Sequence, residues 1–142
     1  MKSKPVVMDH FSTIHTSYIV NFKFENNITI LTGASGTGKT ASFSFIRECM
    51  ALNPDILCIN YLDYQKDIKK MISDVKGKLI VIDNADILLN DEVRKYISVD
   101  ADNQYLIIGR NPKNLFATKE NLYELKSYEV GEQTEFQIHP YL

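Results

Sequence analysis

The stretch GASGTGKT at residues 33–40 has the residue types and the spacing of a loop that binds phosphate. Its three glycines lack Cβ atoms, so backbone N–H groups can approach phosphate oxygens in conformations that other residues avoid. Lys39 would contact the terminal phosphates as a point charge, and the hydroxyl of Thr40 would ligate a phosphate-bound Mg²⁺. The alternative interpretation is a glycine-rich turn that happens to precede a helix.

The segments on either side of this loop favour the phosphate site. Residues 28–32, ITILT, are an apolar and β-branched run that predicts a buried strand, and residues 39–52 have the pattern of a helix. The amino end of that helix would present its positive dipole to the same anion. We therefore expect nine consecutive residues to hold the phosphates of a nucleotide: Gly33, Ala34, Ser35, Gly36, Thr37, Gly38, Lys39, Thr40 and Ala41.

Asp83 is a second residue suited to this chemistry, because it directly follows the apolar run LIVI at residues 79–82. A continuous apolar run of this kind predicts a strand that is covered on both faces, and ligands bind at the carboxyl ends of such strands. We expect Asp83 to hold Mg²⁺ together with Thr40, directly or through water. The alternative is that Asp83 only caps a short helix. Its pairing with GASGTGKT favours the metal role.

Strand and helix signals alternate along most of the chain. Residues 16–24 alternate apolar and polar side chains and end at Asn26 and Asn27, which predicts an antiparallel hairpin with the strand at 28–32. Apolar spacing and helix-ending residues predict further helices at residues 65–76 and 91–99. Further strands are predicted at residues 56–60, 105–108, 122–130 and 135–138.

This alternation predicts one α/β domain over residues 1–142. We expect three layers, α/β/α, around a mostly parallel sheet, with the N-terminal strand added in antiparallel orientation. In such a sheet the carboxyl ends of parallel strands share one edge. The loop at 33–40, Asp83, and the polar turn that begins at Gly109 would then lie close together.

GASGTGKT and LIVID together resemble the Walker A and Walker B motifs of P-loop NTPases. The turn GRN at residues 109–111 resembles the sensor position of the AAA+ and related ATPase branch, and FKFENNITILTGASGTGKT is similar to ABC-type and AAA-type ATPase domains of bacterial mobile elements. The resemblance implies a P-loop fold in which the strand at 105–108 lies between the strands at 28–32 and 79–82. It also implies ATP and Mg²⁺ as ligands, with Arg110 and Asn111 sensing the γ-phosphate. The alternative is an ordinary turn with Arg110 on the surface.

The chain also departs from these families. They commonly place a glutamate after the Walker B aspartate to activate water, but here that position is Asn84, whose amide cannot act as a base. Asp86 is the nearest carboxylate, and it would either orient the water or only cap a helix. The chain has no LSGGQ-like signature, and no helical lid is expected after Asn111. These departures argue against a complete ABC module and against a complete AAA+ motor.

Three functions fit these residues. The first is a Mg²⁺-dependent ATP-binding protein that acts as a slow ATPase or as an ATP-dependent switch. The second is a nucleotide-binding interaction module with little or no hydrolysis, which Asn84 favours. A small-molecule kinase ranks last, because such enzymes clamp two phosphorylated substrates with several arginines and this chain has three, Arg47, Arg94 and Arg110. ATP is expected rather than GTP, since the chain lacks an NKxD segment.

Composition limits the partners and the location. The formal net charge of −2 gives no general attraction to nucleic acid, which stays open as a partner without support from charge. A protein partner or a second copy of the chain is also open. No apolar run approaches the roughly 20 residues that span a bilayer, and the N-terminus lacks the apolar core of a signal peptide. These features predict a cytoplasmic protein without a membrane association.

Overall fold

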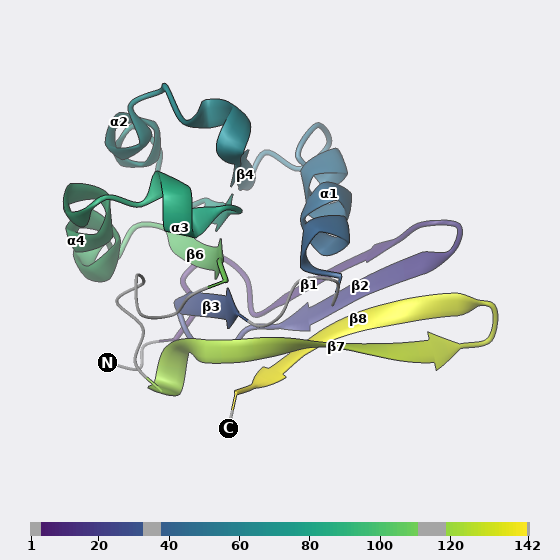
Figure 1. Cartoon of the computed structure of the whole chain (residues 1–142). Coiled ribbons are helices and arrows are strands. Elements are labelled where there is room, and N and C mark those ends of the chain that lie inside the picture. The colour runs from purple at the N-terminus through teal and green to yellow at the C-terminus, as the bar shows by residue number, and fades with distance from the viewer. Residues whose placement is uncertain (1–3, 33–37, 111–118, 142) are drawn as a thin grey trace.

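The computed structural model of the chain describes residues 4–32, 38–110 and 119–141. Eight strands form one sheet, in the order β1-β2-β8-β7-β3-β6-β5-β4 (Figure 1). The strands are β1 (His10–Ile14), β2 (Tyr18–Lys23), β3 (Ile28–Thr32), β4 (Ile56–Ile59), β5 (Leu79–Ile82), β6 (Gln104–Ile108), β7 (Leu122–Val130) and β8 (Gln133–Pro140).

The helices in the described part of the chain are short. The α-helices are α1 (Lys39–Cys49), α2 (Ile68–Ser73), α3 (Ala85–Leu88) and α4 (Asp91–Val99), and the 3₁₀ turns are η1 (Tyr61–Asp63) and η3 (Lys119–Asn121). None of the helices seen in residues 4–32, 38–110 and 119–141 has the length and apolar character needed to cross a membrane.

One half of the sheet is parallel. β3 pairs with β7 on one side and with β6 on the other, β6 pairs with β5, and β5 pairs with β4, all in parallel orientation. The strand order therefore places β6 between β3 and β5, as the resemblance to P-loop NTPases implies. Because the strands are parallel, the carboxyl ends of β3, β5 and β6 lie at one edge.

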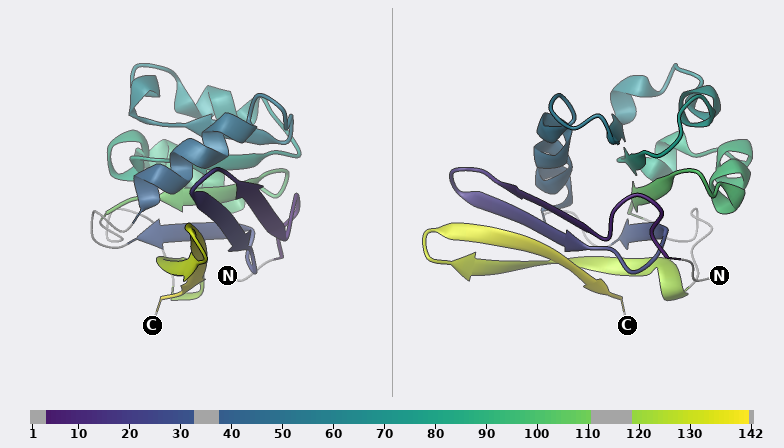
Figure 2. Two further views of the ribbon diagram at one scale, coloured as in Figure 1. Left: turned by 90° about the vertical axis from the view of Figure 1, so that its right-hand side faces the viewer. Right: turned by 180° about the vertical axis from the view of Figure 1, so that it is seen from behind.

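The other half of the sheet is mixed and strongly curled (Figure 2). β7 and β8 form a long antiparallel hairpin, β8 pairs in parallel with β2, and β2 pairs antiparallel with β1. This half bends toward α1, so that the whole sheet forms a half-barrel beside that helix (Figure 2). The C-terminal strands thus lie between the N-terminal strands and β3.

The expected three-layer α/β/α fold with a mostly parallel sheet is wrong. The β7–β8 hairpin inserts into the sheet, and the curled strands cover α1 where a layer of helices was expected. The expected hairpin between residues 16–24 and 28–32 is also wrong, because β2 pairs with β1 and β8 rather than with β3. The physical reason is that periodicity fixes which residues form a strand but leaves its partner strand open.

The hydrophobic core lies on both faces of the central strands. β5 illustrates this, because all four of its side chains are 0 % exposed, which confirms a strand covered on both faces. On one face, α1 and the curled strands enclose a cluster that includes Phe22, Leu31, Phe43, Ile46, Val81, Leu106 and Phe136. On the other face, α2, α3 and α4 cover a cluster that includes Ile30, Ile72, Ile80, Ile82, Val93, Ile97 and Ile107.

Candidate functional site

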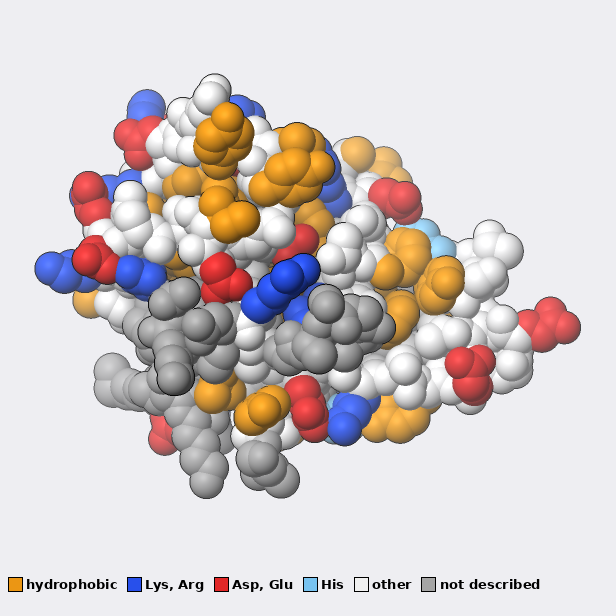
Figure 3. Space-filling model, viewed as in Figure 1, with side chains coloured by type: hydrophobic (Ala, Val, Ile, Leu, Met, Phe, Trp, Pro, Cys, Tyr) orange, Lys and Arg blue, Asp and Glu red, His pale blue; other side chains and the backbone are white. Residues whose placement is uncertain are grey.

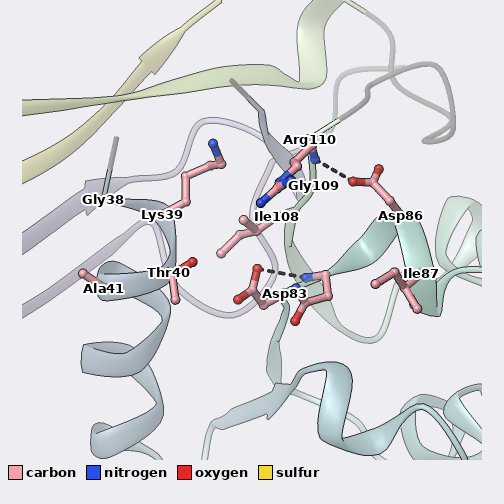
Figure 4. A pocket seen from close by; sticks show the side chains of 11 residues that line it. Gly38, Lys39, Thr40, Ala41, Asp83, Asp86, Ile87, Ile108, Gly109 and Arg110 are labelled. Carbon is pink, nitrogen blue, oxygen red and sulfur yellow. Dashed lines mark hydrogen bonds between the residues drawn. The ribbon is translucent and has the colours of Figure 1, made fainter. Parts of the chain in front are cut away.

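A cavity of about 680 Å³ lies where α1 begins and where β5 and β6 end. Acidic and basic side chains lie next to each other on this face of the molecule (Figure 3), and the close view shows those that line the cavity (Figure 4). The cavity is lined by Gly38, Lys39, Thr40, Ala41, Asp83, Asn84, Asp86, Ile87, Ile108, Gly109 and Arg110. The structure thus brings together every described residue of the expected site.

Some of the expected site residues lie outside the described part of the chain. They are Asn111 and the first five residues of the proposed phosphate loop, Gly33, Ala34, Ser35, Gly36 and Thr37. Their expected roles stay predictions from the sequence.

Gly38 is required at its position for two separate reasons. Its φ of +104° lies in a region that side-chain-bearing residues rarely adopt. A Cβ atom built on Gly38 would also lie 2.6 Å from Cε1 of Phe136 in β8. Its carbonyl accepts a hydrogen bond from the backbone N–H of Ser42 at 2.8 Å, so Gly38 begins α1. The sequence assigned this glycine to phosphate binding alone, and its packing against the C-terminal hairpin was not predicted.

Lys39 is the first residue of α1 and is only 8 % exposed. Burial lowers the pKa of its ammonium group, and the positive charge of Arg110 lowers it further, while the carboxylate of Asp83 acts in the opposite direction. Lysines are rarely buried to this extent unless an anion accompanies them. The site therefore holds a positive charge that a phosphate group would stabilise.

The amino end of α1 is suited to an anion. Gly38 gives the helix no side-chain cap, and the first turn has no acidic residue. Thr40 in that turn is exposed, and it lines the cavity together with Ala41. The first turn of α1 therefore has no carboxylate of its own to compensate the positive end of the helix dipole. An anion in the cavity would interact favourably with this end of the helix.

Asp83 directly follows β5 and is 9 % exposed. One carboxylate oxygen, Oδ1, accepts a hydrogen bond from the backbone N–H of Asn84 at 2.8 Å. Burial raises the pKa of the carboxyl group, and the Asn84 N–H and the charge of Lys39 partly offset that effect. The residue that caps α3 is Asn84 and not Asp83, so the alternative in which Asp83 only caps a helix is wrong.

Asn84 has a backbone conformation that the sequence did not reveal. Its φ of 55° and ψ of 38° are left-handed, and within the described residues it is the only non-glycine residue with a positive φ. Its side-chain Oδ1 accepts a hydrogen bond from the backbone N–H of Tyr61 in η1 at 3.2 Å. Asparagine is one of the few side-chain-bearing residues that tolerate this conformation.

Asp86 lies in the first turn of α3, beyond the capping position. Its Oδ2 accepts a hydrogen bond from the backbone N–H of Arg110 at 2.7 Å (Figure 4). The carboxylate therefore links α3 to the end of β6, a contact that differs from the helix cap considered from the sequence. Its expected role in orienting water stays a prediction.

Arg110 has a firmly held backbone and an exposed side chain at the cavity. Besides the bond to Asp86, its carbonyl accepts a hydrogen bond from Oγ1 of Thr32 at 3.2 Å. The preceding residue, Gly109, donates its backbone N–H to the carbonyl of Leu31 at 3.1 Å. The turn is thus attached to both β3 and α3. Arg110 is close enough to Lys39 for its charge to lower the lysine pKa.

A magnesium site in this cavity fits the residues present. No group of three His, Cys, Asp or Glu side chains that would hold a metal ion occurs within the described ranges. Mg²⁺ is usually bound through one or two carboxylates and the phosphates of a substrate, with waters completing the shell. Asp83 and Thr40, which both line the cavity, would supply one carboxylate and one hydroxyl.

Sequence reasoning missed the apolar part of the cavity. Ile108 is the last residue of β6, and Ile87 is 71 % exposed on α3. The position of Ile108 directly before the polar turn was a usable signal. Ile87 carried no such signal, because α3 is only four residues long and its direction depends on the conformation of Asn84.

A scan against protein families finds no family model that matches, and a search of curated proteins finds none that matches either. The resemblance to P-loop NTPases therefore stays a prediction from GASGTGKT and LIVID.

Proposed function

We propose that the chain is a Mg²⁺-dependent ATP-binding protein that hydrolyses ATP slowly or acts as an ATP-dependent switch. One observation carries this proposal: Lys39 and Asp83 come from separate elements, are both buried, and line the same cavity. Burial of charged groups is costly, and residues with shifted pKa values cluster at functional sites. A bound nucleotide with its metal ion would place an anion beside Lys39 and a cation beside Asp83.

The proposed roles follow from position. The phosphates would lie against the amino end of α1, where Gly38 and Lys39 line the cavity, and residues 33–37 would extend this contact as the sequence predicts. Asp83 and Thr40 would hold Mg²⁺, which neutralises charge on the β- and γ-phosphates when bound. Arg110 adds a second positive charge at the cavity. The preference for ATP rests on the missing NKxD segment, and a cytoplasmic location fits an ATP-binding protein.

Slow hydrolysis is supported by the residues that follow Asp83. The amide of Asn84 cannot accept a proton from water. The carboxylate of Asp86, the other candidate base, already accepts a hydrogen bond from the N–H of Arg110. The same two observations favour the second candidate function, a nucleotide-binding module with little or no turnover, whose partner would be another protein or a second copy of the chain.

Calorimetry with ATP and Mg²⁺ tests the proposed binding. We expect Lys39→Ala to weaken binding at least 10-fold, on the order of 1.4 kcal/mol, because it removes the buried charge. Lys70→Ala is the matched control, since Lys70 is an exposed lysine of α2 that pairs with Asp74 at 3.1 Å outside the cavity. Equal affinities of wild type and Lys39→Ala would refute the proposal.

Phosphate release distinguishes the two candidate functions. It would be followed with ATP and Mg²⁺ at several protein concentrations, with and without DNA. A low rate of phosphate release per protein molecule that rises with protein concentration supports a slow ATPase that works with a second copy. Binding without release under any of these conditions supports the interaction module.

A further inference from the structure

We propose that Asn84 is a positioning residue that couples the carboxylate of Asp83 to the turn η1. This inference rests on the proposed function, because it assigns Asn84 a role in how the Mg²⁺-nucleotide site is held. It also gives Asn84 a role of its own at the position where the ATPase families that the chain resembles commonly have a glutamate. Three features of the structure support it: the backbone of Asn84, its side chain, and the exposure of η1.

The backbone of Asn84 fixes the Asp83 carboxylate. The backbone N–H of Asn84 donates to Oδ1 of Asp83 at 2.8 Å, and the left-handed conformation of Asn84, with φ at 55°, directs the chain from this bond into α3. Among residues with a side chain, asparagine and aspartate adopt this conformation most readily, and longer side chains such as glutamate do so rarely. The left-handed backbone at position 84 therefore favours asparagine over a longer side chain.

The side chain of Asn84 reaches a different element. Its Oδ1 accepts the backbone N–H of Tyr61, the first residue of η1. η1 is itself closed by a capping box, in which Oδ1 of Asn60 accepts from the N–H of Leu62 at 3.0 Å and Oδ2 of Asp63 accepts from the N–H of Asn60 at 3.1 Å. Because these hydrogen bonds hold η1 together, a displacement of Tyr61 by Asn84 would shift the whole turn.

η1 and the residue after it carry large exposed side chains, whose positions would change if the turn shifted. Tyr61, Leu62 and the following residue Tyr64 are 55 %, 60 % and 64 % exposed. Apolar side chains gather over η1 and α3 on the face that also presents the cavity (Figure 3). Asn84 thus joins a buried carboxylate to an exposed turn through its backbone N–H on one side and its amide oxygen on the other.

This arrangement makes the cavity and η1 thermodynamically coupled. A Mg²⁺-nucleotide complex that fixes Asp83 would also hold the N–H of Asn84, and through the same residue it would strengthen the bond to Tyr61. Coupling between sites is reciprocal, so loss of the bond to Tyr61 must weaken Mg²⁺-dependent nucleotide binding by the same factor. Nucleotide binding without Mg²⁺ does not involve Asp83, so loss of the bond to Tyr61 should weaken it less.

Two variants of Asn84 separate its functions. Asn84→Gly keeps the left-handed backbone but removes the acceptor for Tyr61. Asn84→Asp keeps both the backbone tolerance and an acceptor oxygen. Asn90→Gly is the control, because Asn90 makes an equivalent side-chain bond to the N–H of Val93 at 2.9 Å without lining the cavity.

The test is amide hydrogen exchange at Tyr61, resolved by NMR, with circular dichroism as a check that each variant is folded. Without nucleotide, we expect exchange at Tyr61 to be about 3- to 10-fold faster in Asn84→Gly than in wild type, and unchanged in Asn84→Asp and Asn90→Gly. With ATP and Mg²⁺, exchange at Tyr61 should slow in wild type and in Asn84→Asp, but not in Asn84→Gly.

Two results would overturn the coupling. One is equal exchange at Tyr61 in wild type and Asn84→Gly, which would show that the amide oxygen does not hold η1. The other is unchanged exchange at Tyr61 in wild type while calorimetry shows that ATP and Mg²⁺ bind. If calorimetry shows no binding, the proposed function fails and the coupling fails with it. The difference without nucleotide then still shows whether Asn84 holds η1, so the two failures are distinguishable.

Discussion

The carboxylate of Asp86 accepts the backbone N–H of Arg110 at 2.7 Å, and this bond joins α3 to the turn that ends β6. Both residues line the cavity. The sequence offered two roles for Asp86, as an orienter of water and as a helix cap. The structure adds a third role, in which Asp86 fixes the backbone of an arginine that lines the same cavity.

Variants of Asp86 separate the first and third roles. Asp86→Ala removes the acceptor of a solvent-exposed bond, and we expect a loss of about 0.5–1.5 kcal/mol in the free energy of unfolding, measured with urea. Asp86→Asn retains an acceptor oxygen, so most of that stability should remain. If Asp86 orients water, the rate of phosphate release should fall equally in both variants, because neither has a carboxylate. If it only holds Arg110, the rate should survive in Asp86→Asn.

The buried charges of the cavity lead to a second prediction. The pKa of Lys39 is lowered and that of Asp83 is raised, mainly by burial, so the fold disfavours the charged form of each residue. We expect Lys39→Met and Asp83→Asn to raise the free energy of unfolding of the nucleotide-free protein by about 0.5–2 kcal/mol at neutral pH. Both should bind Mg²⁺ and ATP more weakly in calorimetry. A clear loss of stability in both variants would mean that these charges support the fold.

The same pKa shifts set the pH dependence of binding. Asp83 must be ionised to hold Mg²⁺, and its raised pKa means that protons compete with the metal at higher pH than for an ordinary aspartate, whose pKa is about 3.9. Lys39 has a lowered pKa and loses its charge at lower pH than an ordinary lysine. We expect affinity for ATP with Mg²⁺ to fall at both ends of the pH range.

A titration without Mg²⁺ is the control for the acidic side. In the presence of a chelator, the affinity for ATP should still fall at high pH, because Lys39 loses its charge there. The fall in affinity at low pH should disappear, because Asp83 then has no metal ion to hold. The free energy of unfolding of the nucleotide-free protein gives an independent test of both pKa shifts. The stability that Asp83 contributes should be lost as the pH rises through its raised pKa. The stability that Lys39 contributes should be lost as the pH falls through its lowered pKa.

Local features of the fold could be predicted from the sequence because side-chain periodicity is a local property. The strands at Ile28–Thr32, Leu79–Ile82 and Leu122–Val130 and the helix at Asp91–Val99 have the predicted bounds. The strand partners could not be predicted in the same way, since β8 pairs with β2 over more than 100 residues of chain. β1 was missed because only Phe11 among its residues is buried.

In the candidate site, too, local positions could be predicted from the sequence but contacts between elements could not. Lys39, Asp83 and Arg110 could be expected near one another, because each lies directly beside the end of an apolar strand or a glycine loop, and parallel strands end at one edge. The contacts between them depend on backbone detail that periodicity does not contain. The left-handed conformation of Asn84 and the bond from Arg110 to Asp86 are of this kind.

The packing of Gly38 against Phe136 gives the last prediction. Gly38→Ala combines two costs, a strained φ of +104° and a Cβ atom 2.6 Å from Cε1 of Phe136. Backbone strain alone costs about 1–3 kcal/mol. We expect urea unfolding to show a larger loss than that, because Phe136 is 6 % exposed and has little room to move.

Gly131→Ala gives the cost of a left-handed backbone without a contact, because Gly131 has a φ of +62° and no atom within 4 Å of a built Cβ. The excess loss in Gly38→Ala over Gly131→Ala then contains the contact with Phe136 and the larger strain at a φ of +104°. Combining Gly38→Ala with Phe136→Leu should recover much of that excess, since the ring atom in question is absent from leucine. Equal losses in the two alanine variants would show that the hairpin yields to the added Cβ, and that Gly38 is needed only for its backbone conformation.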